Sequence, residues 1–179
     1  MAGVVNNTTW VTVEPSTATG DVWRCTSIYH YPPELNSGRH NVFIDAYKDG
    51  SRVRSDSLFA IWGWEGQRSD EQSPDVALNK RAPDPCCDIP IEKGMKIWCR
   101  LSGYPSDTVR NLHAVIDGTN DGNSWHHHSY LVVFTLQNSN TSQPPITPQP
   151  VIEDEPTRLT KLEARVDALE KLFYSLQGD

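Results

Sequence analysis

Short runs of alternating hydrophobic and polar residues fill the chain from about residue 8 to residue 137. The runs are rich in β-branched and aromatic side chains, and Gly, Pro, Asn and Asp separate them, which is typical of β-strands joined by turns. Nothing in this stretch keeps a helical period over several turns, so we predict a mainly β domain. The predicted strands are residues 10–13, 22–31, 41–47, 52–54, 58–64, 89–91, 96–101, 112–116 and 130–136.

The strand spacing predicts an antiparallel β-sandwich, and the sequence leaves both a jelly-roll and an immunoglobulin-like version open. Asp49 and Gly50 stand between two alternating runs, which is a strong signal for a hairpin. The segment 65–88 is long, polar and contains prolines. We expect it to run over the surface, where long loops often carry function.

The composition changes after residue 137 to Asn, Ser, Thr, Gln and Pro. Proline at this density favours an extended, semi-rigid spacer. We therefore divide the chain into a β-sandwich head at residues 1–137, a linker at residues 138–156 and a helical coiled coil at residues 157–179.

Hydrophobic residues after Pro156 recur at alternating intervals of three and four, which is the pattern of a coiled coil. Arginines at g positions and glutamates at e positions favour parallel chains. Two consecutive Arg-h-x-x-h-Glu patterns, where h is apolar, resemble the trimerisation motif of short coiled coils. The alternative is a helix folded back on its own head, but such a helix normally has a wider apolar stripe. The predicted trimerisation residues are Arg158, Leu159, Leu162, Glu163, Arg165, Val166, Leu169, Glu170, Phe173 and Leu176.

The formal net charge of −7 and the pI near 5.3 argue against a partner bound through a nucleic-acid backbone. No apolar run is long enough to span a bilayer, so we expect no membrane insertion. The first residues lack the features of a signal peptide, which predicts synthesis and retention in the cytoplasm. A secreted or cell-surface protein is the alternative if a leader has been removed.

The four cysteines, Cys25, Cys86, Cys87 and Cys99, lack the Cys-x-x-Cys spacing of a zinc ribbon. We expect buried free thiols, with a disulfide that involves one of the vicinal pair as the alternative.

Residues 126–128 are three consecutive histidines, and on a strand His126 and His128 would share one face. They could bind zinc or copper if His30, His40 or His113 came from neighbouring strands. Structural, hydrogen-bonded histidines are the favoured interpretation. Residues 117–123 partly resemble the start of a calcium-binding loop but lack its distal glutamate, so a turn is favoured there. We therefore predict no cofactor.

The sequence contains no nucleophile elbow, phosphate-binding loop or zinc-protease motif, so we predict no enzymatic activity. The many Trp and Tyr residues could instead stack on sugar rings. Trp62 and Trp64 share one side of their strand, and we expect that side to face the core. The candidate ligand-binding residues are Tyr104, Trp125, His126, His128, Asp117 and Asp121.

Residues 29–30, 40–45, 64–71, 89–91 and 122–130 resemble a β-sandwich accessory module of the kind attached to bacterial and phage glycan hydrolases. That resemblance implies adhesion to a surface or glycan rather than catalysis, and no hydrolase domain accompanies the module here. A head, a Pro-rich spacer and a coiled coil also resemble bacteriophage fibre and capsid-decoration proteins, which are made in the host cytoplasm and displayed on the virion.

We therefore expect a non-enzymatic, homotrimeric virion-surface protein that binds a capsid protein or a surface glycan. The alternative is a free-standing carbohydrate-binding module or lectin with an oligomerising tail. A metal-dependent enzyme built on the histidines is a third, less favoured hypothesis.

Overall fold

The computed structural model describes residues 5–32, 35, 39–92, 94–114 and 128–138. The chain separates into two compact units, Met1–Ile146 and Thr147–Asp179, and all described residues belong to the first. The predicted linker and coiled coil lie outside the described residues. Within the described part, no helix is both long enough and apolar enough to cross a bilayer.

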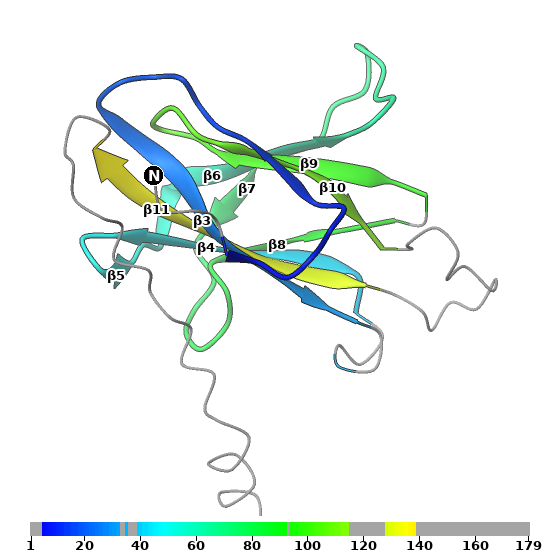
Figure 1. Cartoon of the computed structure of the whole chain (residues 1–179), viewed down its shortest axis with the longest axis horizontal. Coiled ribbons are helices and arrows are strands. Elements are labelled where there is room, and N and C mark those ends of the chain that lie inside the picture. The colour runs from blue at the N-terminus through cyan, green and yellow to red at the C-terminus, as the bar shows by residue number, and fades with distance from the viewer. Residues whose placement is uncertain (1–4, 33–34, 36–38, 93, 115–127, 139–179) are drawn as a thin grey trace, which may run out of the picture. The chain divides into compact units, whose positions relative to one another are not determined.

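The first of two sheets is built around β11, which lies between β3 and β4. It follows the order β1 (Val5–Asn6), β3 (Asp21–Tyr31), β11 (Ser129–Asn138), β4 (Asn41–Lys48) and β5 (Ser51–Arg52), and β8 (Cys87–Pro90) also pairs with β4. β11 runs antiparallel to β3 and parallel to β4. The first and last long strands of the described part therefore lie side by side (Figure 1).

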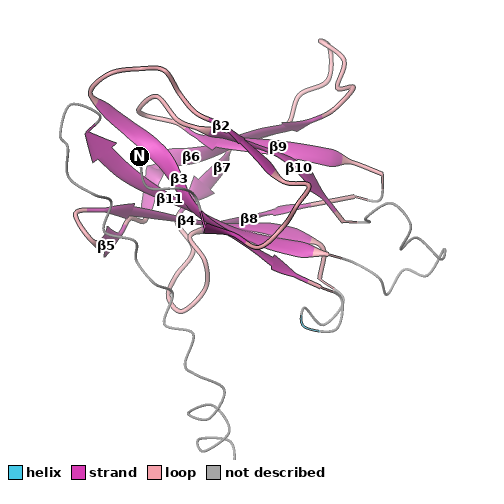
Figure 2. Cartoon of the chain, viewed as in Figure 1, coloured by secondary structure: helices cyan, strands magenta, loops and turns pink. Residues whose placement is uncertain are grey.

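The second sheet is antiparallel throughout. Its order is β2 (Thr12–Glu14), β10 (Thr108–His113), β9 (Lys96–Leu101), β6 (Ser55–Trp64) and β7 (Val76–Leu78). Figure 2 shows the two sheets as two layers of strands, and long loops connect them.

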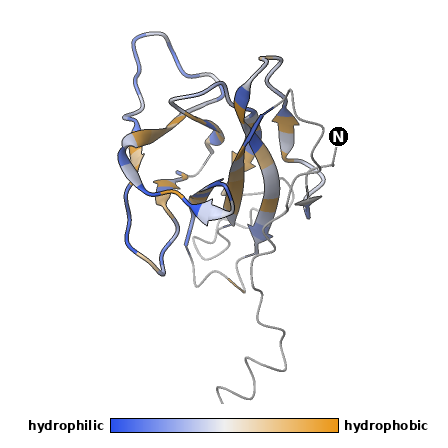
Figure 3. Cartoon of the chain, turned by 90° about the vertical axis from the view of Figure 1, so that its left-hand side faces the viewer, coloured by the Kyte–Doolittle hydropathy of each residue, from blue (hydrophilic) through white to orange (hydrophobic). Residues whose placement is uncertain are grey.

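One hydrophobic core lies between the sheets, because alternate residues of their strands point inward. Ile28, Ile44 and Phe134 enter it from the first sheet and are fully buried. Ile97 and Leu112 enter it from the second sheet. Figure 3 shows hydrophobic residues, in orange, alternating with less hydrophobic residues, in paler colours and blue, along the strands. Full burial of each such side chain contributes roughly 1.5–3 kcal/mol.

The structure confirms the mainly β prediction and the hairpin. β4 and β5 pair directly, Lys48 with Ser51, across a turn in which Asp49 and Gly50 have φ of 51° and 75°. Each of the nine predicted strands has a counterpart, although β10 begins at Thr108, earlier than predicted. The short strands β1 and β7 were not predicted, and β7 lies within the segment that we expected to be entirely a surface loop.

The predicted antiparallel pairing fails for two pairs of strands, because β11 pairs parallel with β4 and β1 pairs parallel with β3. Hydrophobic alternation reports which face of a strand is buried, but it carries no information on the direction of the neighbouring strand. Parallel neighbours need a crossover connection. Here the chain between β4 and β11 supplies it by building most of the second sheet. The choice between a jelly-roll and an immunoglobulin-like fold stays a prediction.

All four cysteines are free and buried, as expected from the sequence. Burial raises the pKa of each thiol, for Cys99 to about 12 and for Cys25 well above its ordinary value. A buried, protonated thiol is a poor nucleophile and a poor metal ligand. These side chains therefore act as small hydrophobic residues of the core.

Candidate functional site

Two of the histidines singled out from the sequence meet in the first sheet. His30 lies on β3 and His128 directly precedes β11, and the pairing of these strands brings the rings together. The His30 Nε2 and His128 Nδ1 atoms are 2.7 Å apart, and the rings stack with centroids 4.9 Å apart. One ring therefore donates a hydrogen bond to the other.

Tyr130 connects this histidine pair to the second sheet. Its hydroxyl accepts a hydrogen bond from Trp10 Nε1 at 3.1 Å and donates one to the His113 carbonyl at 2.9 Å. The Trp10 ring stands edge-on to His30, with centroids 5.1 Å apart. Burial raises the pKa of Tyr130, which keeps its hydroxyl protonated as a donor. We call Trp10, His30, His113, His128 and Tyr130 the histidine–aromatic cluster.

The geometry of the cluster differs from that of a metal site. A tetrahedral zinc ion with Zn–N distances of about 2.0–2.1 Å holds its ligand nitrogens about 3.3 Å apart, farther than the facing nitrogens of His30 and His128. In the described ranges, no group of three or more His, Cys, Asp or Glu side chains could hold a metal ion. His40 contributes its carbonyl, which accepts a hydrogen bond from Ile91 N at 2.7 Å. The candidate calcium segment, residues 117–123, lies outside the described residues.

We expect Tyr130→Phe to lower the free energy of unfolding by about 1–3 kcal/mol, because Trp10 loses a buried acceptor and the His113 carbonyl loses a donor. Urea unfolding of the full chain measures the change. Tyr104→Phe is the matched control, since this tyrosine is 42% exposed, and its effect should stay within about 0.5 kcal/mol. Equal effects of the two variants would show that the Tyr130 hydroxyl does not join the sheets.

The candidate ligand-binding residues do not form one site in the described part. Tyr104 lies in the turn before β10, where its ring stands edge-on to Trp23 at 6.4 Å. His128 donates its backbone N–H to the Ala114 carbonyl, directly after β10. The two residues are therefore at opposite ends of that strand. Trp125, His126, Asp117 and Asp121 lie outside the described residues.

Trp62 and Trp64 were expected to face the core, and Trp62 packs against it. Its indole N–H donates to the Pro74 carbonyl at 2.9 Å, which ties the loop after β6 to the sheet. The Trp64 ring lies 6.0 Å from the Trp62 ring. The prediction is therefore confirmed for Trp62, which packs against the core and also holds this loop in place.

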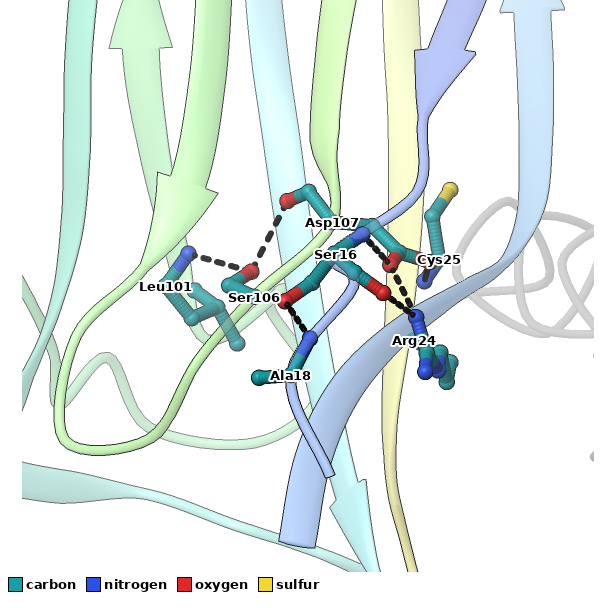
Figure 4. A network of polar contacts seen from close by, with 7 residues as sticks. All are labelled: Ser16, Ala18, Arg24, Cys25, Leu101, Ser106 and Asp107. Atoms are coloured by element: carbon teal, nitrogen blue, oxygen red, sulfur yellow. Dashed lines mark hydrogen bonds and ion pairs between the residues drawn. The ribbon is translucent and has the colours of Figure 1, made fainter. Parts of the chain in front are cut away.

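A buried carboxylate that the sequence analysis missed joins the two sheets. Asp107 is 4% exposed, and its Oδ1 accepts hydrogen bonds from Ser16 N and Arg24 Nη1, both at 2.8 Å. Its Oδ2 accepts a hydrogen bond from Cys25 N at 3.0 Å (Figure 4). The available signal was Arg24, the only Lys, Arg, Asp or Glu residue in the predicted strand 22–31, because a charged side chain needs a partner when it packs beside a core.

Asp107 and its neighbours also complete the open edge of β3. Trp23 N donates to the Pro105 carbonyl at 2.8 Å, and Asp107 N donates to the Trp23 carbonyl at 2.9 Å. The Ser106 hydroxyl accepts from Leu101 N at 3.1 Å and holds the same turn against β9. The segment before β10 therefore takes the place of a neighbouring strand along the first part of β3.

A second buried carboxylate, Asp45 on β4, holds the segment that carries the vicinal cysteines. Its Oδ1 accepts a hydrogen bond from Cys86 N at 3.0 Å, and its Oδ2 lies 2.9 Å from Arg52 Nη2. The Arg52 guanidinium also lies over the Tyr47 ring, 5.7 Å from its centroid. Asp45 and Asp107 are thus both occupied in connecting segments of the fold.

Comparison with protein-family models, with curated proteins and with solved structures found no match to the chain, so its own residues are the basis for a function.

Proposed function

We propose that this chain is a non-enzymatic, homotrimeric protein of a virion surface, a capsid-decoration or fibre component that attaches to a capsid protein or a surface glycan. The observation that carries the proposal is the pair of consecutive Arg-h-x-x-h-Glu patterns, from Arg158 to Glu163 and from Arg165 to Glu170. In parallel chains each arginine faces a glutamate of a neighbour.

The described part supports an adhesion role in one respect. Its two buried carboxylates, Asp45 and Asp107, are held in ion pairs and backbone hydrogen bonds that join strands. A two-sheet scaffold whose strands are joined in this way suits a protein that presents a surface. Three such surfaces on one coiled coil would multiply weak contacts through their effective concentration.

Replacing Leu162 and Leu169 together by Asp should convert the trimer to a monomer, because the seam would bury three like charges at each of two levels. Size-exclusion chromatography with light scattering on the full chain measures the mass. We expect the native protein to have three times the mass of one chain, which is 20.1 kDa, and the variant to have the mass of a single chain. Thr160→Asp with Ala164→Asp adds the same charge at positions that face away from the seam and should leave the trimer intact.

A monomeric native protein at micromolar concentration would contradict the trimer, and absence of the protein from purified virions would contradict the virion role. The alternative is a free-standing carbohydrate-binding protein with an oligomerising tail. It is favoured by Trp98 on β9, which lies between the buried Ile97 and Cys99 and therefore faces away from the core. Glycan binding by a protein that is absent from virions would support it.

A further inference from the structure

The outer face of the second sheet carries a small apolar surface at its centre. Ile97, Cys99 and Leu101 of β9 are buried, so the residues between them, Trp98 and Arg100, point away from the core. On β6, which lies beside β9 (Figure 1), Gly63 pairs with Trp98 and Ile61 pairs with Arg100. The side chains of Ile61 and Trp98 are half-buried, and that of Arg100 is exposed.

The Trp98 ring lies directly on the backbone of β6. A Cβ atom at Gly63 would come within 2.7 Å and 2.8 Å of the ring atoms Cζ2 and Cε2 of Trp98. The Gln67 side-chain oxygen lies against the same position, and the Gln67 amide donates to the Glu71 carbonyl at 3.2 Å. Glycine at this position therefore lets the indole settle onto the strand, where the loop after β6 holds an amide group beside it.

Arg100 supplies a charge that the rest of this face does not balance. Lys96 lies 3.9 Å from Glu65, and Arg110 lies 2.7 Å from Glu14, so the neighbouring cations are paired. Among the described residues, the Arg100 side chain forms no ion pair and no hydrogen bond. A chain with a net charge of −7 thus places one uncompensated guanidinium beside an aromatic platform.

We propose that this face binds a pyranose sugar that carries a carboxylate. The apolar face of the sugar ring stacks on Trp98, and the carboxylate pairs with the planar guanidinium of Arg100, which suits two-point recognition of a carboxylate. Residues two apart on a strand are separated by about 6.6 Å, so one sugar unit can reach both. This inference rests on the proposed attachment function and names the ligand class for it.

Two other classes of partner fit the same face less well. A stable protein interface covers about 800 Å² on each partner, whereas the apolar side chains of this patch are only Phe59, Ile61 and Trp98, all half-buried. Single-stranded nucleic acid also stacks on aromatic rings. A nucleic-acid backbone needs a row of cations that can neutralise successive phosphates, whereas Lys96 and Arg110 of this face are already paired with Glu65 and Glu14.

The test is a binding titration of the full chain against uronic-acid and sialic-acid oligosaccharides, each paired with its methyl ester. We expect binding of the acids and a loss of tenfold or more on esterification, which removes the charge and keeps the ring. Trp98→Ala and Arg100→Gln should each weaken binding at least tenfold, and Arg100→Lys should weaken it by less. Arg100→Gln changes an exposed side chain, so the test remains decisive even if Trp98→Ala fails to fold.

Lys48→Gln and Tyr104→Ala are the controls, because the first removes an exposed cation from the first sheet and the second removes an exposed aromatic ring from the turn between β9 and β10. Both should leave the affinity unchanged. Equal affinity for acids and esters, loss of binding in Tyr104→Ala in place of Trp98→Ala, or binding of oligo-dT through Trp98 would each overturn the inference. If the native protein is a trimer but binds no oligosaccharide, the sugar site is wrong and the assembly stands. If it binds these acids as a monomer, the trimeric assembly is wrong and the sugar site stands.

Discussion

Asp107→Ala is expected to lower the free energy of unfolding by about 3–5 kcal/mol, the usual effect of removing one partner from a buried ion pair. The change removes the carboxylate partner of Arg24, which keeps its hydrogen bond to the Ser16 carbonyl, and leaves the backbone N–H groups of Ser16 and Cys25 without their acceptor. The Arg24 side chain is 24% exposed. Water can therefore partly hydrate it in the variant, which places the expected loss at the lower end of that range.

The same measurement on Asp70→Ala provides the control. Asp70 also pairs with an arginine, Arg68, but the two side chains are 74% and 70% exposed. Exposed ion pairs contribute about 0–1 kcal/mol, so urea unfolding should barely change. Asp107→Asn should fall between the two alanine variants, because the amide keeps one acceptor oxygen but places an N–H₂ group where a second acceptor is needed. A loss in Asp107→Ala no larger than that in Asp70→Ala would contradict a connecting role for Asp107.

The folded protein is expected to lose stability steeply above pH 9. The ordinary pKa of a thiol is 9.0, and burial raises the pKa of all four cysteines in the folded state. The unfolded chain therefore releases thiol protons at a lower pH than the folded chain does. The stability that depends on these groups is fully present below pH 9 and is lost as the pH rises toward the folded pKa values.

The loss of stability can be calculated for one thiol and then added over the four. Between pH 8 and pH 10, ionisation in the unfolded state costs about 1.4 kcal/mol of stability per buried thiol, and up to about 5–6 kcal/mol for four. That is comparable with the total stability of an ordinary domain, about 5–15 kcal/mol. Tyr31 and Tyr130, whose pKa values burial also raises from 10.0, add to the loss at still higher pH.

Urea unfolding under reducing conditions at pH 8 and pH 10 tests this expectation, with Cys99→Ala as the comparison. The variant is less stable at both pH values because it leaves a small cavity. Its loss between the two pH values should nevertheless be smaller than that of the native protein by about 1.4 kcal/mol. Contributions from lysines and exposed groups cancel in this comparison. An equal loss in both proteins would show that Cys99 ionises as readily in the folded state as in the unfolded state.

The positions of most strands could be predicted because alternation is a local property. Along β9, the buried Ile97, Cys99 and Leu101 alternate with more exposed residues as the sequence indicates. β7 was missed because Val76–Leu78 is a short hydrophobic run inside a polar, proline-containing segment, and its place in the sheet depends on pairing with β6.

The candidate sites show a similar division. The sequence identified His128 and offered His30 as a partner, and the structure brings these rings within hydrogen-bonding distance. It assigned no role to Asp107, because an isolated aspartate after Pro105 and Ser106 is also typical of an exposed turn. It counted Trp98 only among the aromatic residues, since the contribution of Gly63 is visible only when β6 and β9 lie side by side.

The sequence by itself determined that the described part is mainly β, where its hairpin turns, and that its cysteines are buried, because these properties follow from local periodicity, turn chemistry and composition. The tertiary structure alone decided which strands are neighbours, that β11 runs parallel to β4, and which charged residues meet. The physical reason is that long-range pairing depends on the packing of residues far apart in the chain. Asp107 and Arg24, 83 positions apart, become partners only when the two sheets close over one core.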